Sequence, residues 1–347
     1  MRRATEDELQ RWDELVAANP DGGNVLQTVA WGDFKARWGW RPQRMVYELA
    51  DGRQVAAQWL VRSVPLQGDV WYCPKGPGVT VPADYQEVVR QTQEFGLGGV
   101  LGRLESEVPA SELAAEQLHE LRLVRANRDP GSKSTIFVNL APSEEEILAS
   151  FNQTARRNIR KAQSAGVEVR PVEATDENLA VMYQLMQAVD ARAHYGLRPR
   201  DYYLDYWRAQ VAAGQAQLFL VMHEGECLSG IFVTYLGQRG WYKDGGSFDA
   251  KRELQPSYLM QWEVMRWLKG KGVTSYDMMG VPNPDQLGTG DPRESLYEFK
   301  RKFNPEITEF VGCWDVPLNS TRYRFWRTFG ERVASKLANR SPERFLY

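Results

Sequence analysis

Several features that would assign this chain to a familiar class are missing from its sequence. Its 347 residues include only three cysteines, Cys73, Cys227 and Cys313, and no two of them form a CxxC pair. This usage argues against a disulfide framework or a structural zinc site and is typical of a reducing compartment. The N-terminal segment MRRATEDELQ has no apolar run of the kind found in signal peptides. No stretch approaches the eighteen apolar residues that a membrane span needs. We therefore expect a cytoplasmic protein.

An excess of charge is also missing. The 43 basic and 45 acidic residues give a formal net charge of −2, which argues against general coating of nucleic acid. One local exception lies in FNQTARRNIRKAQSAGVEV, residues 151–169. Leu148, Phe151, Ala155, Ile159 and Ala162 would fall on one face of a helix, and Arg156, Arg157, Arg160 and Lys161 on a separate arc. This basic arc either contacts phosphate or simply solvates a helix.

The usual motifs of covalent and metal-dependent catalysis are not found either. The sequence has no GxSxG, HExxH or GxxxxGK[ST] motif, and its three histidines show no metal-ligand spacing. We therefore expect no metal and no cofactor. The chemistry that remains is group transfer in which the substrate supplies its own nucleophile and the protein positions it.

A repeated pattern indicates the fold. The length favours two domains. Residues 46–78 and 218–246 both read as strand, tight glycine turn, longer strand and aromatic strand, which predicts a duplicated α/β unit. A capping box formed by Ser143 and Glu146 marks the start of the second half. The expected fold class is α/β with mixed sheets.

Seven segments, in this order, make the chain similar to a known family. They are QTVAWGDFKARWGW, YCPKGPGV, TARRNIRKAQSAGVEV, GLRPRDYY, WYKDGGS, YDMMGV and SLYEFKRKFNPEI, spread over residues 26–307. The combination resembles the FemABX aminoacyltransferases, in the compact form without a helical-hairpin arm. The resemblance implies two tandem acetyltransferase (GNAT)-like domains. It also implies transfer of an amino acid from aminoacyl-tRNA to the side-chain amine of the diamino acid, lysine or ornithine, in a peptidoglycan stem peptide.

The resemblance assigns residues to the acceptor. Lys35 and Trp38 match a segment that contacts the phosphate and sugar of the muropeptide, although an amphipathic core helix would show the same pattern. Lys75 and Gly76 match in YCPKGPG, and Arg198 and Tyr202 match in GLRPRDYY. Tyr242 and Asp244 lie in WYKDGGS, where the family has an aromatic residue in place of Asp244. The complete acceptor set is Lys35, Trp38, Lys75, Gly76, Arg198, Tyr202, Tyr242 and Asp244.

Three residues are assigned to catalysis in the same way. Phe299 and Lys300 match the most recurrent motif of the family, and an ammonium at Lys300 would stabilise the oxyanion or the leaving ribose oxygen. Glu105 stands where the family often has an aspartate, so it would orient or deprotonate the attacking amine; the alternative is transfer assisted by the substrate itself. The tyrosine expected shortly before that carboxylate is Val100 in this chain.

The resemblance also suggests partners and a division of labour. Residues 1–141 with 316–347 would form the domain that binds the muropeptide, and residues 142–315 the domain on the tRNA side. Arg156, Arg157, Arg160 and Lys161 would face tRNA. The acceptor would be UDP-MurNAc-pentapeptide or a lipid II-type precursor, with peripheral contact at the inner membrane surface and a monomeric protein.

Two other functions remain open at this stage. A coenzyme A-dependent N-acyltransferase would use the same scaffold, but QLGTG at 286–290 has the wrong spacing for its pyrophosphate loop. A non-catalytic adaptor would use the basic segment and the tail from Asn319 onward. We expect that tail to be a terminal helix with Phe325, Phe329 and Val333 packed inward; the alternative is contact with anionic lipid or RNA.

Overall fold

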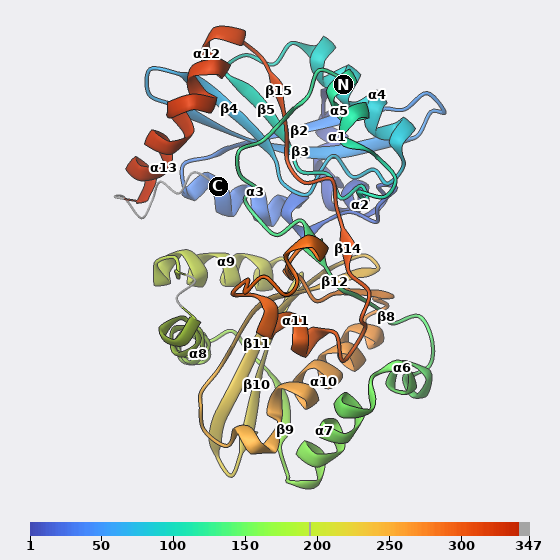
Figure 1. Ribbon diagram of the computed structural model, residues 1–347, viewed down its shortest axis with the longest axis vertical. Helices are drawn as coiled ribbons and strands as arrows, with labels where there is room; N and C mark the ends of the chain where they lie inside the picture. Colours follow the sequence, from blue (N-terminus) through green and yellow to red (C-terminus); the bar gives the residue numbers. More distant parts are fainter. Residues whose placement is uncertain (194–195, 340–347) are drawn as a thin grey trace. The chain divides into compact units, whose positions relative to one another are not determined.

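A computed structural model describes residues 1–193 and 196–339, with the side chains of 336–339 left out. The chain forms two compact units, and the second is inserted in the first. Unit 1 comprises Met1–Lys133 and the chain from Glu309 onward, and unit 2 comprises Ser134–Thr308 (Figure 1). The chain passes between the units eight and seven residues before the expected positions at 141/142 and 315/316. The first shift arises because residues 137–139 pair with a strand of the second sheet, not the first.

Unit 1 is built on a seven-stranded sheet of order β1-β2-β3-β4-β5-β15-β6. Its strands are β1 Arg2–Arg3, β2 Arg41–Glu48, β3 Gln54–Val64, β4 Gly68–Cys73, β5 Leu101–Leu104, β6 Val124–Arg125 and β15 Trp314–Pro317. Its helices are α1 Glu6–Gln10, α2 Trp12–Ala17, η1 Val25–Gln27, α3 Val29–Arg37, α4 Pro82–Phe95, α5 Ala115–Glu120, α12 Ser320–Phe325, the π-helical turn η4 Trp326–Gly330, and α13 Glu331–Asn339. A capping box opens α1, since Thr5 and Glu8 exchange side-chain and backbone bonds.

Unit 2 repeats this plan around a six-stranded sheet of order β8-β13-β12-β11-β10-β9. Its strands are β8 Phe137–Asn139, β9 Glu168–Val172, β10 Ala216–His223, β11 Glu226–Leu236, β12 Arg239–Ser247 and β13 Ser275–Asp277, while β7 Ser134–Thr135 and β14 Thr308–Glu309 form a separate ribbon. Its helices are α6 Glu144–Ser150, α7 Gln153–Ser164, α8 Asp176–Ala193, α9 Arg200–Ala212, η2 Arg252–Leu254, α10 Pro256–Gly270, η3 Pro284–Gln286 and α11 Glu294–Lys300.

The predicted internal repeat is confirmed by strand pairing. In unit 1, β2, β3 and β4 form an antiparallel meander, and β5 then adds to β4 in parallel after the helix α4. In unit 2, β10, β11 and β12 form the same meander, and β13 adds to β12 in parallel after α10. A parallel pair needs a crossover helix, which explains why a long amphipathic helix follows each meander. Both units therefore have one mixed sheet covered by helices.

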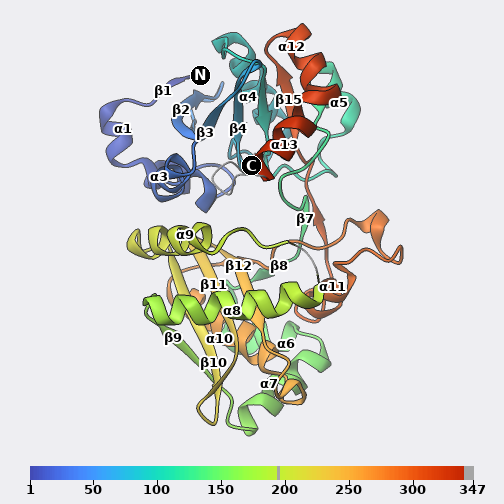
Figure 2. The ribbon, with the colours of Figure 1, turned by 90° about the vertical axis from the view of Figure 1, so that its left-hand side faces the viewer.

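Helices lie on both faces of the second sheet. Figure 2 shows α8 and α9 in front of this sheet, with α7 and α10 behind it. The main core of unit 2 lies on the α7 and α10 side, where Ile159, Val233, Met265 and Phe303 are among the buried residues. Within the described ranges, no helix combines the length and apolar character needed to cross a bilayer.

Candidate functional site

In unit 1, predicted acceptor residues gather where β4 and β5 end. Strand β4 leads into Lys75 and the cis peptide bond between Gly76 and Pro77, and β5 leads into Glu105. Because β4 and β5 are parallel, their carboxyl ends meet at one edge of the sheet. The amide of Glu105 donates to the carbonyls of Cys73 and Gly76, both at 3.2 Å, and so joins the two loops. This edge therefore places Lys75, Gly76 and Glu105 in one cluster.

Glu105 is buried and held by two side chains. The Tyr72 hydroxyl donates a hydrogen bond to its carboxylate, and the Lys75 ammonium lies 3.2 Å from its other oxygen. Lys75 also lies 3.8 Å from Glu107, whose carboxylate accepts from Asn24 at 3.3 Å. A buried carboxylate with both a hydroxyl and an ammonium as partners is fixed in orientation.

Gly76 has no room for a side chain. A Cβ there would lie 3.0 Å from the sulfur of Cys73 and 3.1 Å from the amide group of Gln27. Gln27 in turn donates to the carbonyl of Pro74 and accepts from the amide of Gln58. The loop that carries Lys75 is therefore held against buried groups.

Lys35 is buried, which was not expected for a lysine of an amphipathic helix. Its ammonium lies 5.4 Å from the ring centroids of both Trp31 and Trp40. The Trp40 ring lies 6.3 Å from that of Tyr72, which extends the cluster from Lys35 to Glu105. Trp38 forms the C-cap of α3 and is half-buried beside Phe34. We call these five residues the Glu105 cluster: Lys35, Trp40, Tyr72, Lys75 and Glu105.

Tyr72 was not among the predicted site residues. The family resemblance places a tyrosine shortly before Glu105, but Val100 stands there, completely buried beside Leu101 and Trp326. The hydroxyl comes instead from the neighbouring strand, where Tyr72 pairs with Arg103 in register. The signal was present in YCPKGPG, but only the pairing of β4 with β5 connects it to Glu105.

In unit 2, Lys300 ends α11 and is also buried. Its ammonium donates to the carbonyls of Met279 at 2.5 Å and Gly280 at 3.0 Å, and it lies 5.7 Å from the ring centroid of Tyr242. Burial lowers the pKa of Lys300 to about 7, and the nearby carboxylate of Asp277 opposes part of this shift. Lys300 can therefore both donate and accept a proton near neutral pH.

The carbonyls that hold Lys300 belong to a fixed turn. Met279 has a positive φ of 57°, which is rare for a side chain of this kind. Asp277 stabilises the turn because its carboxylate accepts from the Met279 amide at 2.6 Å and from the Thr135 hydroxyl. Phe299 packs on Tyr258 and Phe303, at 5.0 and 5.4 Å between ring centroids, and so anchors the residue before Lys300 in the core.

A β-bulge separates Tyr242 from Asp244. In the β11–β12 ladder, Val233 pairs with Tyr242 but Phe232 pairs with Asp244, so Lys243 is the extra residue. Tyr242 therefore faces the same layer as Lys300, and Asp244 faces the opposite layer. There Asp244 accepts from the indole of Trp207 on α9 at 2.9 Å.

Arg198 and Tyr202 lie on that opposite layer. The guanidinium of Arg198 stacks 4.6 Å from the ring centroid of Tyr202, at the start of α9. Tyr203 links this pair to Trp207, with ring centroids 6.2 and 5.5 Å away. The structure thus joins Arg198, Tyr202 and Asp244 through aromatic neighbours, and it joins Tyr242 to Lys300 on the other face.

The basic segment forms the helix α7 as expected. Asn152 caps it by accepting from the amide of Thr154, which allows the helix to resume after the break at Phe151. Ala155, Ile159 and Ala162 are buried in the core of unit 2. Arg157, Arg160 and Lys161 are exposed, and half-buried Arg156 donates to the carbonyl of Ala149 at 3.3 Å.

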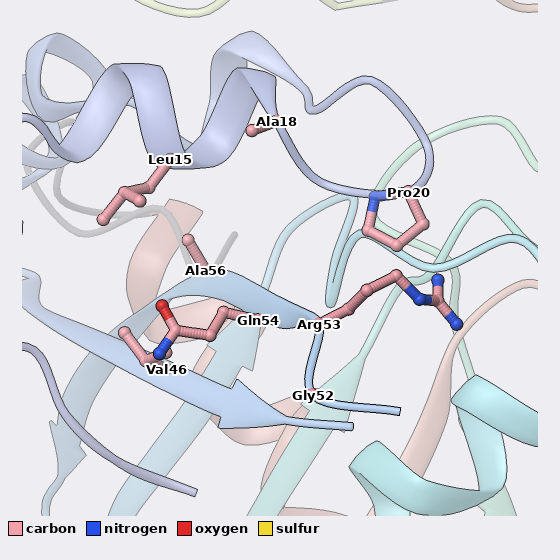
Figure 3. Close-up of a pocket in the computed structure, with 8 residues that line it drawn as sticks. All are labelled: Leu15, Ala18, Pro20, Val46, Gly52, Arg53, Gln54 and Ala56. Atoms are coloured by element: carbon pink, nitrogen blue, oxygen red, sulfur yellow. The ribbon is translucent and has the colours of Figure 1, made fainter. Parts of the chain in front are cut away.

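A shallow pocket in unit 1 does not coincide with any predicted site residue. Figure 3 shows it between the end of α2 and the β2–β3 hairpin, lined by Leu15, Pro20, Arg53 and Ala56 among others. The charge of Arg53 is already engaged by Asp51 and Asp84. This pocket is therefore not part of the candidate site.

Comparison with known proteins gives a consistent relationship. A sequence family described as acetyltransferase (GNAT) domain matches residues 149–301. The chain is 27% identical to UDP-N-acetylmuramoylpentapeptide-lysine N(6)-alanyltransferase of Weissella viridescens, over 91% of this chain and 95% of that protein. It is 22% identical to Lipid II:glycine glycyltransferase of Staphylococcus epidermidis, over 90% and 92%. Its fold matches the crystal structure of FemX with a TM-score of 0.81 and 20% identity, over 94% of this chain and all of that one. Together with the seven ordered motifs and the repeated GNAT-like sheets, these similarities agree with the resemblance of the chain to the FemABX aminoacyltransferases.

Proposed function

We propose that this protein transfers an amino acid from aminoacyl-tRNA to the side-chain amine of the diamino acid in a peptidoglycan stem peptide, and so builds the interpeptide bridge. Its relatives are named as an alanyltransferase to the lysine of UDP-N-acetylmuramoylpentapeptide and a glycyltransferase to lipid II. The observation that carries the proposal is the buried lysine at the end of α11, with a pKa of about 7, in the motif that the family shares.

The reaction is aminolysis of an ester. The neutral amine of the acceptor attacks the acyl carbon, a C–N bond forms, and the ester bond to the ribose oxygen of the tRNA breaks. The amine loses a proton and the departing oxygen gains one. An ordinary lysine amine is protonated at pH 7, and freeing it costs about 4.6 kcal/mol, so a proton acceptor for it is valuable.

The Glu105 cluster suits the acceptor amine. A fixed carboxylate attracts an ammonium and can take its proton. Because Tyr72 and Lys75 already hold Glu105, the carboxylate would meet the incoming amine in one orientation. The indole and ammonium groups around Lys35 suit a sugar or uracil ring and a phosphate, respectively. We assign unit 1 to the muropeptide on this basis.

Lys300 suits the ester. In its protonated form it would stabilise the oxyanion and deliver a proton to the leaving ribose oxygen, and in its neutral form it avoids repelling the cationic aminoacyl group. Tyr242 faces the same layer and would bind near the ester. We assign unit 2 to the aminoacyl-tRNA, with Arg156, Arg157, Arg160 and Lys161 of α7 on its phosphates. Arg198, Tyr202 and Asp244 remain assigned to the acceptor, where the guanidinium can grip a carboxylate or phosphate.

The decisive experiment uses a mixed pool of charged tRNAs with purified muropeptides that carry lysine, ornithine or another diamine. The expected result is a muropeptide mass increase equal to one or more amino acid residues, which is abolished by ribonuclease. The GNAT match keeps acyl-coenzyme A transfer as the competing activity. A mass increase with acetyl-coenzyme A and none with charged tRNA would establish that alternative instead.

A further inference from the structure

The C-terminal segment of unit 1 presents an apolar stripe to solvent. Phe325, Phe329 and Val333 are 54%, 59% and 51% exposed. They recur every four residues, and the two phenyl rings lie 6.2 Å apart. The expectation that these three side chains pack inward is therefore wrong.

A different set of side chains fixes the segment to the sheet. Tyr323 and Trp326 are buried against Val70, Val100 and Leu101 of unit 1. Figure 1 shows α12 and α13 beside β4 and β5, where these contacts occur. Tyr323 and Trp326 thus form the face that packs on the sheet, and the stripe at 325, 329 and 333 stays exposed.

Buried charges hold the same orientation. Arg103 is fully buried and pairs with Asp315 of β15 and with Glu331, the first residue of α13, each at 2.7 Å. If α13 rotated to bury the stripe, Glu331 would move away from Arg103. Arg103 would then lose one of its two acidic partners. Removing one partner of a buried ion pair is strongly destabilising, so this roll is opposed.

The exposed face is also uniformly basic. Its charged side chains are Arg322, Arg324, Arg327 and Arg332, all exposed. The only acid between residues 320 and 335 is Glu331, which is buried with Arg103. Within the described ranges, none of the four arginines forms an ion pair with an acidic side chain.

A second apolar element lies in the turn that abuts this segment. The turn between β3 and β4 projects Leu66, which is completely exposed and has a positive φ of 65°. The turn abuts the helix because a Cβ on Gly330 would come within 2.5 Å of the side-chain oxygen of Gln67. Leu66 is therefore an exposed apolar side chain in the turn that abuts η4.

We propose that this face, formed by Leu66, Phe325, Phe329 and Val333 with the four arginines, docks on the surface of an anionic lipid bilayer. Aromatic and aliphatic side chains between arginines match the interfacial mode of amphipathic helices, which combine shallow apolar insertion with attraction to acidic headgroups. Single-stranded nucleic acid would favour aromatic stacking platforms alone, and Leu66 and Val333 offer none. This membrane contact does not depend on the proposed catalytic residues. If the proposed function is right, the contact would bring the enzyme close to a lipid-linked acceptor.

The test is flotation of the full-length protein with vesicles of phosphatidylcholine alone or with 40% phosphatidylglycerol. We expect binding to the anionic vesicles, little binding to the neutral ones, and weakening by salt. Phe325→Ser/Phe329→Ser should bind at least tenfold more weakly, and Arg324→Gln/Arg327→Gln should lose the preference for anionic lipid. The matched control is Val81→Ser/Phe95→Ser, which removes two exposed apolar side chains from either end of α4 and should bind like wild type.

Three results would overturn the inference. The first is no binding of the wild type to anionic vesicles, and the second is equal binding by wild type and Phe325→Ser/Phe329→Ser. The third is a dimer, or a complex with uncharged tRNA, that forms through this face in place of vesicle binding. Transfer to a water-soluble nucleotide-linked acceptor is measured in parallel and should be unchanged in these variants. If the wild-type protein shows no transfer at all, that result counts against the proposed function. If the wild-type protein transfers but does not float with anionic vesicles, that result counts only against the docking surface.

Discussion

The hydroxyl of Tyr72 on β4 donates a hydrogen bond to the carboxylate of Glu105, which follows the neighbouring strand β5. Two residues that are 33 positions apart are thus joined across a parallel strand pair. The same carboxylate also pairs with Lys75. A carboxylate held in this way has a fixed orientation, so under the proposed function it would not have to reorient when the acceptor amine arrives.

Replacing Glu105 tests that role. Glu105→Gln removes the proton acceptor while it keeps the shape and the Tyr72 partner, so kcat for transfer should fall by about 10²- to 10⁴-fold. KM for aminoacyl-tRNA should stay unchanged. Glu107→Gln is the matched control, since Glu107 is also buried beside Lys75. Equal losses in both variants would assign the effect to Lys75 and not to the Glu105 carboxylate.

Lys300 should be the most sensitive position in unit 2. Loss of one preorganised donor costs about 3 to 4 kcal/mol in other enzymes, so Lys300→Ala should lower kcat by about 100-fold or more. Lys302→Ala is the control, because Lys302 is partly exposed and makes only a 3.6 Å ion pair with Glu298. Single-turnover transfer, measured with thermal unfolding of both variants, separates chemistry from folding. Full activity of Lys300→Ala would refute its catalytic role.

The pKa of Lys300 also predicts how stability depends on pH. The side chain titrates near 7 in the folded protein and near 10.5 when unfolded. Between these values the unfolded chain binds more protons, so the stability of wild type relative to Lys300→Met should rise with pH, by about 2 kcal/mol from pH 7 to 9. Below pH 7 both states are protonated and the difference should level off.

Urea unfolding of unit 2 at pH 6, 7, 8 and 9 measures this difference. Lys302→Met serves as the partly exposed control and should follow wild type across the series. A stability difference between wild type and Lys300→Met that stays constant from pH 7 to 9 would mean that Lys300 keeps its proton in the folded state.

The helix α7 predicts a change in salt dependence. Each phosphate contact releases counterions and adds about 0.7 to 0.9 to the slope of log affinity against log salt concentration. Arg157→Gln/Arg160→Gln should therefore reduce the slope for tRNA binding by about 1 to 2. Arg170→Gln/Arg252→Gln removes the same charge from unit 2 outside α7, where both side chains are already ion-paired, and should leave the slope near that of wild type. The slope is read from filter binding at several salt concentrations.

Local patterns in the sequence were enough to predict the main elements of the fold. The repeat was visible because each meander has the same order of strands and glycine turns, and the capping box predicted at Ser143 is present. The apolar spacing of Ala155, Ile159 and Ala162 predicted the buried face of α7. Each of these patterns involves residues that are close in the sequence, so each one specifies local geometry.

The missing parts depend on contacts between distant residues. The burial of Lys300 relies on carbonyls about twenty positions upstream, in a turn that Asp277 stabilises. The tail was misread because a helical apolar stripe does not reveal which side faces the sheet. Tyr323 and Trp326 form the inward side, and they leave Phe325 and Phe329 outside.

The extra residue at Lys243 marks a position where β12 can change its length. Beyond Lys243, two glycines lie in tight places. A Cβ on Gly246 would lie 2.4 Å from the carbonyl carbon of Leu185, and a Cβ on Gly245 would lie 2.2 Å from the hydroxyl of Tyr242. Deleting Lys243 would remove the bulge and leave Val233 opposite Tyr242 and Phe232 opposite Asp244, so every later side chain would keep its layer. Homologues that shorten the strand at this residue could therefore keep both layers, whereas a side chain at residue 245 or 246 would require its neighbours to shift.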